Sequence, residues 1–166
     1  MSDASAIIYM AAASGNWNKA SSYSRIHPHW WRIPLSARGI TALHVAVSMK
    51  KISFVEKLLN CMSMEDLEIR MADGNTAFCL AAMTGNVKIV GILLGKNGRL
   101  AWIRGQRDML PIQLASCAGH IAMAEFLFQA HQGDLNNLPF QDIVKLFFFT
   151  IDNNIYSKFI HPHMLC

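Results

Sequence analysis

The chain has 166 residues, of which 52% are hydrophobic and 16% are charged. This length suits a single domain, and so apolar a composition excludes a disordered chain because it can build a continuous core. No apolar run approaches the roughly 20 residues that a membrane-spanning helix requires. The four cysteines show no CxxC spacing, which argues against a disulfide framework and suits a reducing cytosol.

The net charge of +4 is distributed unevenly along the chain. Residues 1–51 and 85–107 each carry +5, whereas residues 52–84 and 108–166 each carry −3. In a repeat protein such blocks become bands on the surface, which could steer an acidic partner or an anionic membrane face. A solvated surface without a charge-specific partner explains the bands equally well.

One six-residue phrase occurs three times. It reads TALHVA at 41–46, TAFCLA at 76–81 and LPIQLA at 110–115, with separations of 35 and 34 residues. A period near 33 that carries a T-P-L-H-x-A-like phrase is the signature of ankyrin repeats. The pattern therefore predicts a solenoid, a fold whose function lies in its surfaces.

Each phrase is followed by the pattern of a helix–turn–helix unit. Gly85 and Gly119 stand where the chain must reverse, and glycine readily adopts the left-handed conformation that ends a helix. Lys50 occupies this place after the first phrase, so we expect a strained turn or another geometry there. A second helix, with apolar residues three and four apart, follows the turn.

Two degenerate copies of the phrase extend the array at its ends. AIIYMA at 6–11 lies 35 residues before the first phrase, and Gly15 falls at its turn. KLFFFT at 145–150 starts 35 residues after the third phrase, and Asn154 takes the turn position. Outer units are expected to be atypical because they cap the stack against water.

Polar segments between the units are predicted to form projecting fingers. The segments 73–75 (DGN) and 106–108 (QRD) are rich in turn-forming residues. We expect their tips to reach beyond the helices and to be joined across repeats by short β-contacts. Ser63 and Asp66 have the spacing of a pair that caps a short helical turn.

These patterns predict an all-α fold, namely an ankyrin-repeat solenoid of about five stacked helix–turn–helix units with β-turn fingers and degenerate end caps. The whole chain, 1–166, is expected to form one domain. The expected units lie near 6–38, 39–72, 73–106, 107–141 and 142–166, and the last of them is truncated.

Several motifs resemble one family of plant ankyrin-repeat proteins. They are GNW at 15–17, SFVEKLL at 53–59, MEDLE at 64–68, DGNTA at 73–77 and IRG at 103–105. Longer members of this family carry a C-terminal membrane region called the PGG domain, and the chain is similar to the accelerated-cell-death and salt-tolerance-related group. The resemblance spans roughly residues 6–160. It implies non-enzymatic protein interaction, often at plant membranes and in defence or stress signalling.

The chain departs from that family because it shows no membrane region and because Pro162 stops its last helix. It is either a cut form of a longer protein or a naturally short relative, and the unusual tail 161–166 favours the short form. We expect a cytoplasmic location, with recruitment to the inner face of a membrane through a partner.

No residue pattern points to catalysis, a cofactor or a metal, so an enzyme is not expected. HPH at 27–29 and at 161–163 supplies at most two ligands where a metal needs three or four. A loop role beside a helix-stopping proline is favoured for both. The sequence contains no Gly-rich phosphate loop, HExxH or GxSxG motif. The resemblance implies that His44 hydrogen-bonds to its local turn.

Trp30 and Trp31 are the most unusual feature of the first loop. Two adjacent side chains cannot easily face one core, so one of them could be exposed beside Arg25, Arg32 and Arg38. An exposed tryptophan would suit a protein hot spot, an interfacial membrane anchor or a stacking platform for single-stranded nucleic acid. Packing within the first loop is the favoured alternative.

Stacked repeats form an extended concave face. In ankyrin proteins the fingers and the ends of the first helices line it. The partner-binding residues predicted there are Arg38, Ile40, Ser48, Met49, Asp73, Asn75, Met83, Thr84, Arg107, Met109, Cys117 and Ala118, with Asp152 and Asn153 at the end. This floor is small, neutral and Met-containing, which suits adaptable packing. Because basic fingers alternate with an acidic one, a peptide or protein segment is favoured over nucleic acid.

The leading functional hypothesis is a signalling regulator that binds a partner protein, such as a full-length membrane-anchored relative. The alternative is a peripheral membrane-surface or nucleic-acid binder that uses the basic N-terminal block with Trp30 and Trp31. At the C-terminal cap, Phe147, Phe148 and Phe149 cannot all be buried on one side of a helix. We therefore expect exposed aromatic surface there.

Overall fold

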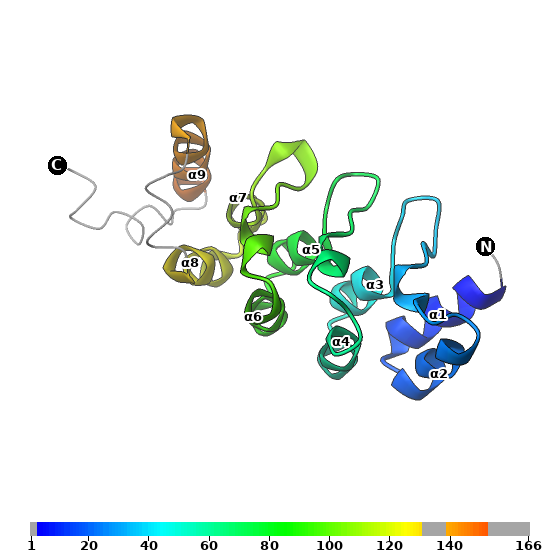
Figure 1. The fold of residues 1–166 in the computed structure, drawn as a ribbon. Helices are drawn as coiled ribbons and strands as arrows, with labels where there is room; N and C mark the ends of the chain where they lie inside the picture. Colours follow the sequence, from blue (N-terminus) through cyan, green and yellow to red (C-terminus); the bar gives the residue numbers. More distant parts are fainter. Residues whose placement is uncertain (1–2, 131–138, 153–166) are drawn as a thin grey trace.

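The computed structural model describes residues 3–130 and 139–152, which form an open stack of helix pairs (Figure 1). The inner helices are α1 (Asp3–Ser14), α3 (Ala42–Ser48), α5 (Ala77–Met83), α7 (Pro111–Cys117) and α9 (Phe140–Asp152). The outer helices are α2 (Trp17–Ser21), α4 (Ile52–Leu59), α6 (Val87–Lys96) and α8 (Ile121–Ala130). Each inner helix contacts the next, and α4, α6 and α8 do the same in the second row. The expectation of an all-α solenoid is confirmed.

Short 3₁₀ helices occupy the connections. They are η1 (Ser22–Arg25), η2 (Trp30–Arg32), η3 (Glu65–Glu68), η4 (Gly98–Trp102) and η5 (Gln106–Asp108). Ser63 and Asp66 cap η3 as expected, because the Ser63 amide donates to Asp66 Oδ2 at 2.9 Å and the Asp66 amide donates to Ser63 Oγ at 3.3 Å.

Three fingers project from one side of the stack (Figure 1): residues 33–41, 69–76 and 103–110. The expected β-contacts across repeats are wrong for the described residues. The one isolated bridge there, between Arg70 and Thr76, lies within the second finger. Neighbouring fingers are joined by a few hydrogen bonds, one of which runs from Arg70 Nη1 to the Arg104 carbonyl. The Ala72 amide donates to the Arg38 carbonyl at 2.9 Å, and the Gln106 amide donates to Asn75 Oδ1 at 2.9 Å.

The inner helices approach closely because small residues face each other across the stack. The last residue of each phrase, Ala46, Ala81 or Ala115, is fully buried, as is Ala11 in the first unit. Alanine has no side chain beyond Cβ, so neighbouring backbones can pack directly against it. The larger apolar side chains of the outer helices complete the main core, and Cys79, Met109 and Leu114 form a small second cluster.

The fourth residue of the phrase caps the start of α3 and of α7, whereas in α5 the Thr76 hydroxyl accepts from the Cys79 amide at 3.2 Å. His44 Nδ1 accepts from the Thr41 amide at 3.2 Å and contacts the Thr41 hydroxyl at 2.8 Å. Gln113 Oε1 accepts from the Leu110 amide at 2.9 Å in the same way. The local hydrogen bond expected of His44 is confirmed, and it satisfies an amide that the helix leaves without a partner.

The helix–turn–helix turns use a left-handed residue. Gly85 and Gly119 have φ of 67° and 75°, and Lys50 has φ of 55° at the corresponding place. The strain expected at Lys50 is therefore confirmed, because a side chain with a Cβ clashes in this conformation.

The less favoured possibility, that one of Trp30 and Trp31 is exposed, is wrong, since they are only 1% and 9% exposed. Both lie in η2, whose three residues per turn direct successive side chains about 120° apart. Trp30 packs against Trp17 and Phe54, with ring centroids 6.0 and 6.5 Å away. Trp31 instead points at the next repeat and donates from Nε1 to Asp66 Oδ2 at 3.2 Å. The favoured alternative, that the first loop packs its tryptophans against the protein, is the one that the structure shows.

The last described helix differs from its sequence phrase. α9 begins at Phe140, directly after Pro139, so the segment 145–150 lies in its middle and the boundary expected at 141/142 falls inside it. Asn153, Asn154 and the tail 161–166 lie outside the described residues. The expected exposed aromatic surface is confirmed for Phe148, which is 58% exposed.

We expect the stability of the protein to depend on pH because His44 is buried in its neutral form. Burial lowers the pKa of His44 to about 4, although the backbone groups of Asn75 and Ile69 oppose the shift. The unfolded chain, with a histidine pKa near 6.5, then binds more protons than the folded chain between about pH 4 and 6.5. The free energy of unfolding should fall by up to about 3 kcal/mol as the pH is lowered through this window. Urea unfolding at several pH values measures it.

The matched variant is His44→Gln, because Gln113 already caps the inner helix α7 in the same way. The variant should fold and lose most of the pH dependence above about pH 4. The pKa values of Asp66 and Asp142 are lowered in the folded protein. The stability that these carboxylates contribute is therefore lost only when the pH falls below that range. If the free energy of unfolding of the variant depended on pH as it does in the wild type, His44 would not be the cause of that dependence.

Lys50→Gly should stabilise the protein by about 1 kcal/mol, because glycine adopts the left-handed conformation without a Cβ clash. Lys51→Gly is the control, since the φ of Lys51 is −84° and glycine relieves no left-handed strain there. Urea unfolding of both variants measures the difference. Equal destabilisation by both would contradict the strain at Lys50.

Candidate functional site

A groove lies between the first and second fingers, over the inner helices α3 and α5. Its volume is about 480 Å³. The residues that line it are Arg38, Ile40, Ser48, Met71, Ala72, Asp73 and Leu80. The groove thus combines two walls from the fingers with a floor from two neighbouring repeats, so that it exists only when the repeats are stacked.

The chemistry of the groove is apolar at its centre and charged at its rim. Ile40, Met71 and Leu80 are half-buried, which leaves part of each apolar side chain available for contact. Arg38 and Asp73 are exposed and carry opposite charges. A ligand that places an apolar side chain between the fingers and polar groups above them would match this pattern.

The groove unites four of the residues predicted from the sequence, namely Arg38, Ile40, Ser48 and Asp73. Three lining residues were missed. Met71 and Ala72 precede the finger turn, and Leu80 is the variable position of the second phrase. Leu80 stands one helical turn before the predicted Thr84, so the helical period alone could have found it.

Asn75 and Met109 were predicted to contact a partner, but the structure places both inside the protein, at 1% and 6% exposure. Asn75 Nδ2 donates to Asp73 Oδ2 at 3.1 Å, and Asn75 Oδ1 accepts from the Gln106 amide. Met109 packs with Cys79 and Leu114. Both residues lie directly before the helix phrase, where the extended chain turns one side chain inward. They build the fingers and do not present a surface.

The remaining predicted positions continue the row of helix ends and finger tips beyond the groove. Arg107, Met49, Cys117 and Ala118 are exposed, whereas Met83 and Thr84 are half-buried. None of these residues lines the groove. Trp30 and Trp31 are buried away from it, and the side chain of Asp152 lies outside the described residues, as does Asn153.

The groove carries no group whose chemistry points to a cofactor. Across residues 3–130 and 139–152, no three His, Cys, Asp or Glu side chains are grouped as a metal site requires. His27 and His29 are both exposed, and the ring of His29 lies against Trp31 with centroids 5.4 Å apart. No helix within the described ranges is long and apolar enough to cross a bilayer.

The family model for ankyrin repeats (3 copies) matches the chain twice, over residues 7–104 and 43–138. The chain belongs to the ankyrin-repeat proteins. The two matches are offset by about one repeat, and together they cover α1 to α8. No curated protein matches the sequence. Ankyrin-repeat proteins are generally protein–protein interaction modules and typically have no enzymatic activity.

Asn75→Ala tests the link between the second and third fingers. The substitution leaves the Gln106 amide without its acceptor and should lower the free energy of unfolding by about 1–3 kcal/mol. Asn60→Ala, at an exposed residue that ends α4, should change it by less than about 0.5 kcal/mol. Equal effects of the two substitutions in urea unfolding would contradict the structural role of Asn75.

Proposed function

We propose that the chain is a non-enzymatic module that binds an extended segment of a partner protein in the groove between the first and second fingers. The observation that carries this proposal is the groove itself, with its apolar centre between Arg38 and Asp73. A peptide can offer an apolar side chain flanked by polar backbone and charged neighbours. Such a segment gains most from a site assembled on a rigid stack, because the stack loses little conformational freedom on binding.

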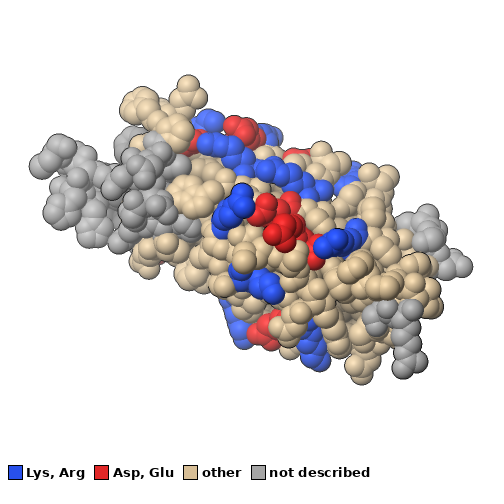
Figure 2. Space-filling model, viewed as in Figure 1, with Lys and Arg blue, Asp and Glu red and all other residues tan. Residues whose placement is uncertain are grey.

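The charges of the groove support a protein partner over a nucleic acid. Nucleic acids require a continuous basic track along the phosphate backbone. The rim instead pairs one arginine with one aspartate. Figure 2 shows basic side chains in a row along the finger edge of this face, with acidic side chains close to them.

The membrane-surface or nucleic-acid alternative depended on an exposed tryptophan in the first loop. Trp30 and Trp31 are both buried, and the indole of Trp31 is bonded to Asp66. Neither tryptophan is therefore available to a membrane or a nucleic acid, and we do not propose this function.

We further propose that the module regulates plant stress or defence signalling from the cytoplasm. In this proposal its partner is a membrane-anchored ankyrin relative, which recruits it to the inner face of a membrane. The support is the resemblance of MEDLE at 64–68 and DGNTA at 73–77 to plant relatives that carry such an anchor.

The groove is tested with peptides selected on the wild-type protein from a random display library. Ser48→Trp should block the groove, since Ser48 is exposed in its floor, and Arg38→Glu should reverse the charge on one side. Each should weaken binding by about tenfold or more, which corresponds to about 1.4 kcal/mol.

Ser53→Trp and Lys57→Glu are the matched controls, because they make the same changes at exposed positions of the outer helix α4. Both should bind the selected peptides as the wild type does. Unfolding in urea confirms that all four variants are folded. Binding that survives both groove substitutions would place the interaction elsewhere on the protein.

A further inference from the structure

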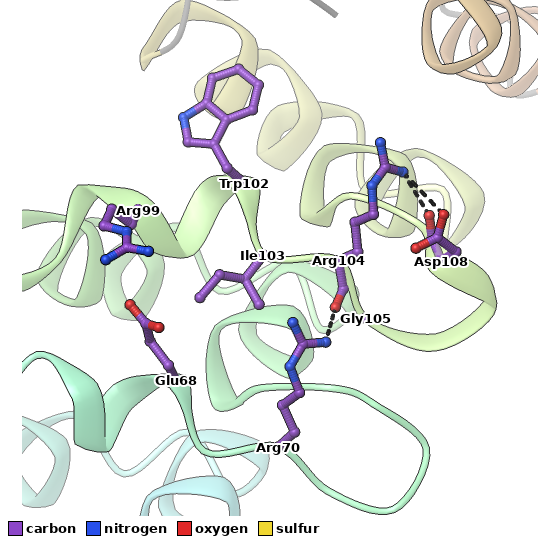
Figure 3. A pocket seen from close by; sticks show the side chains of 8 residues that line it. All are labelled: Glu68, Arg70, Arg99, Trp102, Ile103, Arg104, Gly105 and Asp108. Carbon is purple, nitrogen blue, oxygen red and sulfur yellow. Dashed lines mark hydrogen bonds and ion pairs between the residues drawn. The ribbon is translucent and has the colours of Figure 1, made fainter. Parts of the chain in front are cut away.

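A second pocket, of about 510 Å³, lies between the second and third fingers beside η4 (Figure 3). It is lined by Glu68, Arg70, Arg99, Trp102, Ile103, Arg104, Gly105 and Asp108. It shares no lining residue with the groove of the proposed function. Three arginines from two successive repeats therefore line a space that the groove does not use.

The arginines of this pocket have more hydrogen-bond donors than the protein uses. The guanidinium of Arg99 has no hydrogen bond or ion pair with the described residues. Arg70 donates from Nη1 to the carbonyls of Gly74 and Arg104, the second of which Figure 3 shows. Its Nε and Nη2 have no acceptor in the part of the chain that the structure describes. Because a guanidinium has five N–H donors and cannot lose its charge, these groups favour an acceptor-rich ligand.

The carboxylates near the pocket are already engaged. Asp142 binds both Nη atoms of Arg104 and thereby neutralises that arginine. Asp108 Oδ2 lies 3.6 Å from Arg104 Nη1. Glu68 Oε1 accepts from Asn97 Nδ2 at 3.1 Å, and Glu68 faces Arg99 in Figure 3 with no bond between them. Among the described residues, Arg70 and Arg99 are the arginines of this pocket without an ion pair.

The backbone of the third finger, which forms one wall of this pocket, is strained. Arg107 and Asp108 both have left-handed φ, of 55° and 56°, and Asp108 stands where the first two fingers have Gly39 and Gly74. The strained Asp108 directs its carbonyl to Arg104 Nη1 at 2.8 Å and so fixes the wall of the pocket. Backbone strain at non-glycine residues is concentrated at functional sites.

We propose that this pocket binds the phosphate of a phosphorylated serine or threonine in a segment of a partner protein. A phosphate carries nearly two negative charges and three acceptor oxygens, which can use the free donors of Arg70 and Arg99 together. A carboxylate has fewer acceptor sites for the same donors. Trp102 is half-buried at the edge of the pocket and supplies an apolar wall for the neighbouring peptide residues.

The test uses a short Gly/Ala peptide with one central phosphoserine, titrated against the full chain. The NMR signal of the Trp102 indole N–H should shift saturably with this peptide. The same peptide with serine or with glutamate at the centre should bind about tenfold more weakly or not at all. A shift of equal size and midpoint with the serine peptide, the glutamate peptide or inorganic phosphate would overturn the proposal.

Substitutions locate the site. Arg99→Glu should weaken phosphopeptide binding by about tenfold or more, while Lys88→Glu, the same charge reversal at an exposed position of α6, should leave it within about twofold. Glu68→Gln should strengthen binding, because it removes the carboxylate that faces Arg99 and keeps an oxygen for Asn97. Equal losses in Arg99→Glu and Lys88→Glu, or weaker binding in Glu68→Gln, would overturn the proposal.

The groove variant Arg38→Glu separates the two sites. It should leave the phosphopeptide titration unchanged, since Arg38 does not line this pocket. A loss of phosphopeptide binding in this variant would show that the peptide occupies the groove, and it would overturn the assignment to the pocket.

Discussion

Every surface of this protein depends on one constraint, that a repeat can bury its apolar face only against the next repeat. The close contact is made by alanines at one place in successive units, such as Ala46, Ala81 and Ala115, all fully buried. A larger side chain there would separate the inner helices and open the core. The groove between the fingers is a direct product of this spacing, because its floor comes from two adjacent inner helices.

Polar links between repeats then fix how the units sit on one another. Asp66 is 5% exposed and accepts from Trp31 and from Arg32 of the preceding unit. Burial alone would raise the pKa of Asp66, but these bonds and the Ser63 amide hold it below its usual value. A buried carboxylate left without its donors is strongly destabilising, so this link specifies a geometry as well as a contact. Arg104 and Asp142 form a second such link where α9 meets the stack, because both Nη atoms of Arg104 donate to the buried Asp142 carboxylate.

The fold could be predicted because its signals are local and periodic. The phrase, the glycine turns and the capping pair at Ser63 and Asp66 each depend on residues close in sequence. Non-local packing explains the placement of Trp31, and a local proline explains the start of α9. Trp31 reaches an aspartate 35 residues away, which no pattern within the first loop reveals. The displaced start of α9 follows Pro139, whereas the phrase at 145–150 matched only by its spacing.

The candidate site shows the same division. The sequence by itself determined the repeat, its period and the finger positions that can reach a partner, because these follow from backbone geometry and from residues within one unit. Only the tertiary structure decided which of those positions remain open: Arg38 and Asp73 stay exposed, while Asn75 is used to join two fingers. It also brought Arg70 and Arg99 into one pocket. The physical reason is that exposure and charge pairing depend on the neighbouring repeat, which a residue meets only after the units have stacked.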